Sequence, residues 1–124
     1  MKQPISTLMN RQVSVVEMDQ TVPYVEALFD ERRLSWAPVM EPGGEILGVV
    51  SAHDLTHARA RDPEAATLPV WRLCTYKPIT VDADTPIDEV ARQMVEHGIH
   101  HVVVTEQGHV SGVVSALDFV RSFT

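Results

Sequence analysis

The chain has few of the residues that mark several common classes of protein. Cys74 is its only cysteine, which leaves no partner for a disulfide, indicates a reducing compartment and favours inert packing. Aromatic residues make up 6%, and 10 basic residues against 17 acidic ones leave a net charge of −7, so nucleic-acid binding is disfavoured. No apolar run approaches the roughly 20 residues of a membrane span, and no signal peptide is recognisable. We therefore expect a cytoplasmic protein without a membrane segment, whose partners are small molecules or proteins.

What the chain does contain is a repeated phrase, Gly-Val-Val-Ser-Ala-x-Asp, at residues 48–54 and again at 112–118. The two copies of the phrase are 64 residues apart. Before residue 42 the matching residues are 65 apart, because the loop at 42–44 of the first copy is one residue longer than its counterpart in the second. The matched pairs include Pro4 and Pro69, Leu8 and Leu73, Val16 and Val81, Asp19 and Asp84, and Val25 and Val90. We predict one module of two repeats, 1–60 and 69–124, joined by a linker at 61–68.

Each copy predicts the element order β-α-β-β-α. In the second copy Thr85 and Pro86 are typical of a hydroxyl cap and a first-turn proline, and Gly98 is typical of a helix end. The apolar residues at helical spacing are Ile87, Val90, Ala91, Met94 and Val95. The strands are expected at 79–81, 99–104 and 110–114, with a closing helix from Ser115; the first copy repeats this order at 13–16, 22–32, 34–40, 46–50 and in a helix through 58. The expected fold class is α/β (α+β), with the two repeats packed in pseudo-twofold symmetry around a shared core.

This ordered set resembles the CBS domain, and two in tandem resemble a Bateman module. The resemblance rests on the doubled Gly-h-h-Ser-x-x-Asp phrase at the entry to the last helix and on Ala37, Pro38 and Val39 in the middle strand. It implies a regulatory module without catalytic activity, which binds an adenosine-containing ligand in clefts between the repeats and signals occupancy to a partner protein. It also implies a homodimer formed through helices, with Leu28, Phe29 or the closing helices as candidates. Because the module fills the sequence, we expect a free-standing sensor.

Ser51 and Asp54, like Ser115 and Asp118, have two readings. Their spacing fits a capping box, in which the side chains satisfy backbone N–H groups at the helix start. The family resemblance instead assigns the aspartates to the two ribose hydroxyls of the ligand, for which a carboxylate supplies two acceptor oxygens. The readings are compatible, because a helix start beside a hydroxyl also accommodates a phosphate.

The resemblance places the adenine slot at the first strand of each repeat. Ile79 and Thr80 would serve the cleft of Asp54, while Ser14 and Val15 would serve the cleft of Asp118. Without the family, all four are ordinary strand residues.

His100 and His101 are adjacent on a strand, so their rings point to opposite faces. A metal site lacks a third ligand, and we expect none. In the family these positions often meet ligand phosphates, but the first repeat has Ser35 and Trp36 there, so we expect two unequal sites. Phosphate recognition by histidine should strengthen as the pH falls toward about 6.

Three further side chains are candidates with ordinary structural alternatives. His53 adds a polar contact that Leu117 lacks, Arg121 is either a phosphate contact or a solvated helix residue, and Trp36 is either a stacking platform or an interface residue. With few cations near the proposed sites, AMP, ADP, a dinucleotide such as NAD, or S-adenosylmethionine is favoured over ATP, and AMP is the preferred ligand among them. The competing hypothesis is a structural module that binds no ligand and dimerises or scaffolds a partner. An enzyme is not expected, since no nucleophile and base, P-loop or metal cluster is recognisable.

Overall fold

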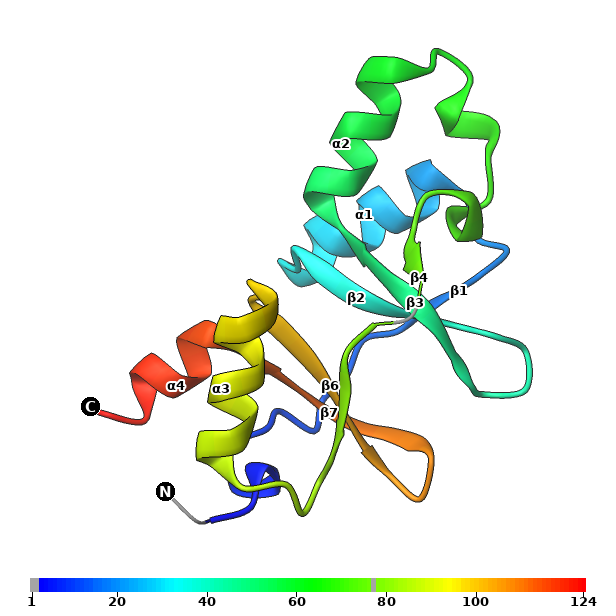
Figure 1. Cartoon of the computed structure of the whole chain (residues 1–124). Helices are drawn as coiled ribbons and strands as arrows, with labels where there is room; N and C mark the ends of the chain where they lie inside the picture. Colours follow the sequence, from blue (N-terminus) through cyan, green and yellow to red (C-terminus); the bar gives the residue numbers. More distant parts are fainter. Residues whose placement is uncertain (1–2, 77) are drawn as a thin grey trace. The chain divides into compact units, whose positions relative to one another are not determined.

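A computed structural model describes residues 3–76 and 78–124 (Figure 1). The chain divides into two compact units. Ser14–Pro78 form the first-repeat unit, and residues 3–13 together with Ile79–Thr124 form the second-repeat unit. Each contains the predicted order β-α-β-β-α, which confirms the fold class.

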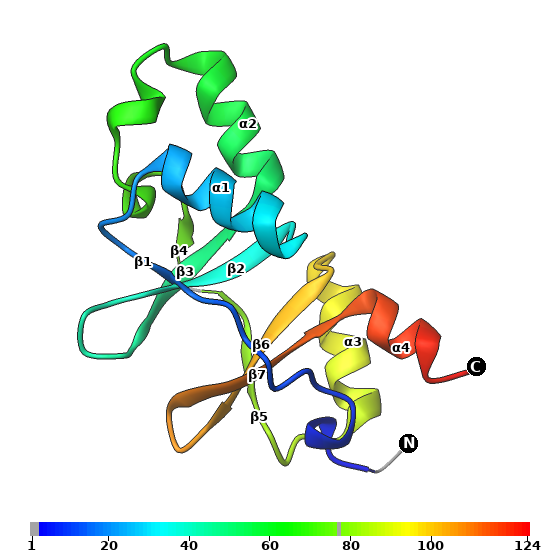
Figure 2. The same cartoon turned by 180° about the vertical axis from the view of Figure 1, so that it is seen from behind.

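The first-repeat unit is a sheet with its two long helices on one face. The sheet order is β1-β2-β3-β4; β1 runs parallel to β2, and the other neighbours are antiparallel. Figures 1 and 2 show α1 and α2 lying over the same face, where valines and Phe29 build the core. The elements are β1 (Val16–Glu17), α1 (Val22–Arg32), β2 (Trp36–Met40), β3 (Ile46–Ser51), α2 (Ala52–Arg61), the 3₁₀ turns η2 (Ala65–Thr67) and η3 (Val70–Arg72), and β4 (Thr75–Tyr76).

The second-repeat unit repeats this plan with a sheet ordered β5-β6-β7. Its core gathers Ile5 from the start of the chain with residues of the sheet and of the long helix. The elements are η1 (Ile5–Thr7), β5 (Thr80–Asp82), α3 (Ile87–His97), β6 (His101–Glu106), β7 (His109–Ser115) and α4 (Ala116–Arg121). None of the helices among the described residues has the length and apolar character to cross a membrane.

The segment that leads into each repeat packs on the last strand of the other repeat. Asn10 forms an antiparallel bridge with Val113 of β7, and Thr75 of β4 pairs in the same way with Val49 of β3. The two pairings are equivalent under the repeat. The compact units therefore have different boundaries from the sequence repeats, because each repeat contributes an edge segment to the other unit.

Some predicted boundaries are wrong by one or a few residues. The first strands begin later than expected, at Val16 and Thr80. Thr85 is not the cap of α3: Pro86 occupies the N-cap position with no side-chain cap bond, and the Thr85 carbonyl accepts from the Ile5 N–H at 2.7 Å. The helix end is confirmed, since Gly98 has the left-handed φ of 61° that suits glycine.

Candidate functional site

Both repeated phrases form complete capping boxes. In α2 the Ser51 N–H donates to Asp54 Oδ2 at 2.9 Å, and the Asp54 N–H donates to Ser51 Oγ at 3.1 Å. In α4 the corresponding distances are 2.8 Å from the Ser115 N–H to Asp118 Oδ2 and 3.3 Å from the Asp118 N–H to Ser115 Oγ. The structure thus contains the capping geometry, and it uses one carboxylate oxygen of each aspartate.

The strand register places one candidate side chain opposite each capping serine. Trp36 pairs with Ser51, and His101 pairs with Ser115. Backbone bonds from Ala52 N–H to Ser35 O and from Ala116 N–H to His100 O repeat the correspondence. Each unit therefore gathers one set: Trp36, Ser51 and Asp54 in the first-repeat unit, and His101, Ser115 and Asp118 in the second.

The two adjacent histidines have different surroundings. His100 is exposed and lines a groove between α3 and α4, whereas His101 is half-buried. Burial lowers the pKa of His101 from its ordinary value of 6.5, the neighbouring His100 adds to this, and Asp118 partly offsets it. His101 therefore favours the neutral imidazole and is close enough to Asp118 for their charges to interact.

The remaining polar candidates lie on the closing helices. His53 is exposed on α2 and stacks on His57, with ring centroids 6.0 Å apart. Arg121 is 69% exposed, and its Nη1 lies 3.8 Å from Asp118 Oδ1, a position that fits either a solvated helix residue or a phosphate contact.

The strand candidates lie at the start of each sheet. Ser14 accepts a hydrogen bond from Arg32 Nη1 at 3.1 Å, and Val15 is 41% exposed. Ile79 is half-buried and Thr80 is exposed. The expected adenine slots combine Ser14 and Val15 with Asp118, and Ile79 and Thr80 with Asp54. Each combination draws on both compact units, and it stays a prediction.

Metal chemistry finds no support among residues 3–76 and 78–124. No group of three or more His, Cys, Asp or Glu side chains there is arranged to hold a metal ion. Cys74 is buried, and burial raises the pKa of its thiol, as expected of a packing residue rather than a nucleophile.

The chain belongs to the CBS domain family, whose profile matches residues 5–61 and 70–124. CBS domain pairs are regulatory modules rather than catalytic ones. The family assignment confirms the resemblance drawn from the doubled phrase.

Solved structures share the fold across nearly the whole chain. The CBS domain pair of protein MJ0100, in complex with 5′-methylthioadenosine and S-adenosyl-L-methionine, is 19% identical with a TM-score of 0.87, covering 99% of this chain and 97% of that one. CBSX2 in complex with AMP is 22% identical with a TM-score of 0.86, covering 98% and 96%.

A curated relative is considerably longer than this chain. Homoserine O-acetyltransferase from Methanococcus vannielii is 23% identical over 121 residues, which are 97% of this chain. The chain spans 25% of that relative's length.

Two features were not anticipated from the sequence. An ion pair joins Glu26 of α1 to Arg59 of α2, with the Arg59 Nε and Nη2 both 2.7 Å from carboxylate oxygens. The groove between α3 and α4 lies at the equivalent place in the second-repeat unit. The sequence signal for the ion pair and for the groove was a mismatch between the repeats, since Glu26 aligns with Ala91 and Arg59 aligns with Phe123.

The residues suggested for dimerisation need one correction. Phe29 is 5% exposed and belongs to the core, and Leu28 packs against that core. A helix-mediated dimer would therefore gain little contact surface from Phe29, whereas the partly buried Leu28 and the closing helices stay predicted candidates.

Proposed function

We propose that this chain is a regulatory sensor module that binds an adenosine-containing ligand at Asp54 and Asp118. The observation that carries the proposal is that each capping box uses Oδ2 of the aspartate. The box leaves Oδ1 to accept from a ribose hydroxyl, and at Asp118 this oxygen also lies 3.8 Å from the exposed Arg121 Nη1. Such a charge-assisted bond contributes about 1.5–3 kcal/mol. Support also comes from the CBS domain pairs solved with AMP and with S-adenosylmethionine.

The two sites are proposed to differ in what they recognise beyond the ribose. We propose that His101 contacts a phosphate near Asp118 and that Trp36 contributes an aromatic surface near Asp54; the strand register, which pairs His101 with Ser115 and Trp36 with Ser51, supports this. We favour AMP because a single phosphate suits the one half-buried histidine of the second-repeat unit.

Differential scanning fluorimetry with AMP, ADP, ATP, NAD and S-adenosylmethionine tests ligand binding. A ligand at 100 times its dissociation constant should stabilise the fold by about 2.7 kcal/mol. Asp54→Asn and Asp118→Asn are the sharpest variants, because asparagine keeps an acceptor oxygen for the cap but removes the charge. Each should lose binding at its own site only, and 2′-deoxy-AMP should bind more weakly than AMP.

Two outcomes would contradict this proposal. A melting shift that survives in the double Asp→Asn variant would mean that the ligand binds elsewhere. The absence of a shift with every compound would favour the alternative, an interaction module without a ligand.

Phosphate recognition by His101 should depend on pH. A bound phosphate stabilises the imidazolium, so binding takes up a proton and AMP should bind more tightly at about pH 6 than at about pH 7.5. Calorimetric titration at both pH values measures this, with His101→Asn expected to remove the dependence and His100→Asn as the neighbouring control. Equal affinities for the unaltered chain would count against a histidine contact.

We also propose that occupancy is reported to a partner protein and that the chain acts as a homodimer. Support for the first comes from the regulatory role of CBS pairs and from the much longer relative that contains a region similar to this one.

A further inference from the structure

A hollow of about 490 Å³ lies at the ends of β1 and β2 in the first-repeat unit. The two strands bring its walls together, because Glu17 pairs with Met40 and the Met18 N–H donates to the Met40 carbonyl oxygen at 3.1 Å. Its apolar lining residues are Val15, Met18, Met40 and Pro42, and its acidic ones are Glu17, Asp19 and Glu41. This acidic hollow therefore combines an apolar lining with negative charge.

The negative charge of the acidic hollow is not balanced locally. Glu17 and Asp19 are exposed, and Glu41 is half-buried. Within residues 3–76 and 78–124, none of the three carboxylates forms an ion pair with Lys or Arg. A cationic group that entered the hollow would therefore meet carboxylates that no described cation engages.

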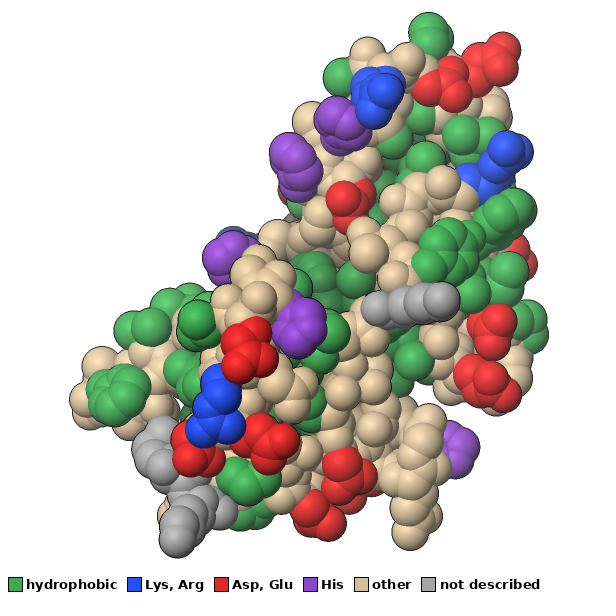
Figure 3. Space-filling model, in the orientation of Figure 1, with side chains coloured by type: hydrophobic (Ala, Val, Ile, Leu, Met, Phe, Trp, Pro, Cys, Tyr) green, Lys and Arg blue, Asp and Glu red, His purple; other side chains and the backbone are tan. Residues whose placement is uncertain are grey.

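Exposed aromatic side chains lie beside the acidic hollow. The Trp71 N–H donates to the Met18 carbonyl oxygen at 3.1 Å, so η3 lies next to the hollow. Trp71 is 39% exposed and Tyr76 is 46% exposed. Figure 3 shows hydrophobic side chains gathered over η3 and β4, with acidic side chains beside them. Because aromatic residues are enriched in protein interfaces, this surface suits a protein partner.

The second-repeat unit shows that the fold does not require this combination. Its equivalent hollow keeps the acidic positions, as Asp82, Asp84 and Glu106. Glu106, however, pairs with Arg11 at 3.2 Å, and Arg11 is the counterpart of Tyr76. Small or polar residues replace the other apolar ones: Thr80 for Val15, Ala83 for Met18, Thr105 for Met40 and Ser6 for Trp71. Folding therefore does not explain the apolar and aromatic surface of the first repeat.

We infer that the acidic hollow, together with Trp71 and Tyr76, docks a segment of a partner protein in which an apolar side chain is flanked by Arg or Lys. The apolar side chain contacts Met18 and Met40, whose flexible thioethers adapt to more than one shape. The basic side chains contact the three carboxylates. The indole of Trp71 already accepts a cation within the chain, since the Arg72 guanidinium carbon lies 5.6 Å from the centre of its ring. A hollow of this size suits a short segment.

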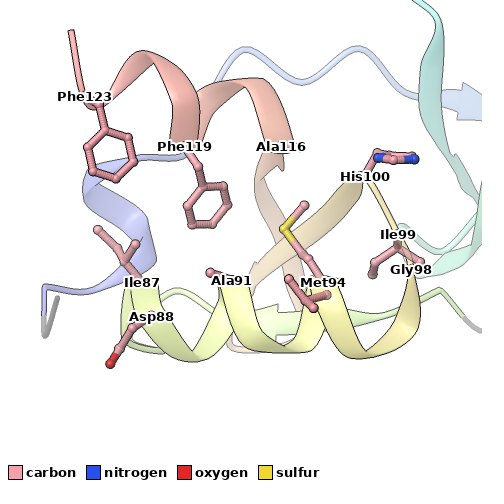
Figure 4. Close-up of a pocket in the computed structure, with 11 residues that line it drawn as sticks. Ile87, Asp88, Ala91, Met94, Gly98, Ile99, His100, Ala116, Phe119 and Phe123 are labelled. Atoms are coloured by element: carbon pink, nitrogen blue, oxygen red, sulfur yellow. The ribbon is translucent and has the colours of Figure 1, made fainter.

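The groove between α3 and α4 has a different character (Figure 4). Its lining is apolar apart from Asp88 and His100, which lie at opposite ends in Figure 4. One carboxylate and one imidazole give it no comparable preference for a cation. Charge complementarity therefore assigns the basic segment to the acidic hollow of the first-repeat unit.

Fluorescence anisotropy tests the docking with four labelled peptides, Gly-Arg-x-Arg-Gly, in which x is Leu, Met, Phe or Trp. At least one should bind the full chain and saturate, and the same peptide with Glu in place of Arg should not bind. Glu17→Gln with Glu41→Gln should raise the dissociation constant about fivefold or more. The matched control is Glu31→Gln with Glu96→Gln, which removes the same charge from exposed positions on α1 and α3 and should change it less than about twofold.

A second set of variants tests the apolar contacts. Met18→Ala with Met40→Thr gives the first repeat the residues of the second and should raise the dissociation constant about tenfold. Because both methionines are half-buried, circular dichroism checks that this variant is folded. Trp71→Ser, which copies Ser6, changes an exposed side chain instead and should also weaken binding.

Three outcomes would overturn the inference: no peptide binds the unaltered chain at about 1 mM, the two pairs of Glu→Gln variants lose affinity equally, or the methionine and Trp71 variants bind as tightly as the unaltered chain. The inference rests on the proposed function only in taking the occupant to be the regulated partner. Peptide binding is measured without an adenosine ligand, so the docking surface and the proposed ligand sites can fail separately.

Discussion

Alanine at Gly48 should cost more stability than alanine at its counterpart Gly112. A Cβ at Gly48 would lie far inside contact distance of the Thr75 backbone carbonyl oxygen and 3.1 Å from Cys74 Sγ. A Cβ at Gly112 would lie 2.6 Å from Met9 Sδ and 3.0 Å from the Asn10 carbonyl oxygen. The nearest obstacle is therefore rigid backbone in the first case and a flexible side chain in the second.

The magnitudes follow from what must move. Either alanine gains about 0.4–1 kcal/mol by restricting the unfolded chain. At Gly112, moving Met9 off its preferred rotamer costs about 0.5–1.5 kcal/mol, so the net change should stay within about 1 kcal/mol. At Gly48, β4 must shift or separate from β3, and each hydrogen bond lost costs about 0.5–1.5 kcal/mol. Because β4 pairs through only two residues, Thr75 and Tyr76, losing two such bonds costs about 1–3 kcal/mol, and subtracting the gain leaves a net loss of up to about 2.5 kcal/mol.

Urea unfolding followed by circular dichroism measures both variants. Met9→Ala should couple favourably with Gly112→Ala, because removing the thioether clears the obstacle, whereas Cys74→Ala should rescue Gly48→Ala little, because the carbonyl remains. The reasoning would be refuted if Gly48→Ala lost no more stability than Gly112→Ala.

Three further predictions concern helix ends and one histidine. Arg33 has φ 54° at the helix end equivalent to Gly98. Arg33→Gly should therefore raise the free energy of unfolding by about 0.5–1 kcal/mol, whereas Gly98→Ala should lower it by about 1 kcal/mol. Thermal melts in which both variants shift the melting temperature in the same direction would contradict this. Ser51→Ala and Ser115→Ala should each lower it by about 1 kcal/mol in urea melts, with the Thr variants as conservative controls, and no loss would mean that the caps are dispensable. Burial lowers the pKa of His101 below 6.5, so His101 of the unfolded chain is protonated first as the pH drops, and the free energy of unfolding falls below about pH 6.5. In thermal melts, His101→Asn should lose less stability over this pH range than the unaltered chain. An unchanged pH dependence in His101→Asn would contradict the lowered pKa.

The order of elements was predictable because every element could be read twice. A strand of two or three residues has almost no periodicity of its own, yet β1 and β5 were located approximately by their matching Val16 and Val81. The helix end at Gly98 was predictable for a local reason, since the left-handed conformation there favours glycine.

The exchange of lead-in segments was not predictable, because the bridge from Asn10 to Val113 spans nearly the whole chain and leaves no local pattern. The only sequence feature related to this exchange was the glycine that begins the repeated phrase. Gly48 and Gly112 allow the lead-in backbone to approach the last strand, a requirement that appears only when both segments are in place.

The exposure of individual helix residues could not be predicted from hydrophobic periodicity either. Val95 lies at helical spacing with Ile87, Val90 and Met94, yet those three are buried and Val95 is 81% exposed. Spacing identifies one face of a helix, but whether the edge of that face is covered depends on how closely the neighbouring helix packs.

The two repeats separate positions that serve the fold from positions free to serve function. Where both copies agree, the structure shows a shared physical requirement: a glycine for close backbone approach, and a serine and aspartate that close a capping box. Where they differ, the fold has tolerated both solutions, so it does not explain the choice. His101 against Trp36 and Ala91 against Glu26 are differences of this kind, at two separate places in equivalent surroundings. An aspartate that caps a helix in both copies is required by the fold, whether or not it also binds a ribose. The positions at which the two repeats differ therefore say more about function than the repeated phrase alone.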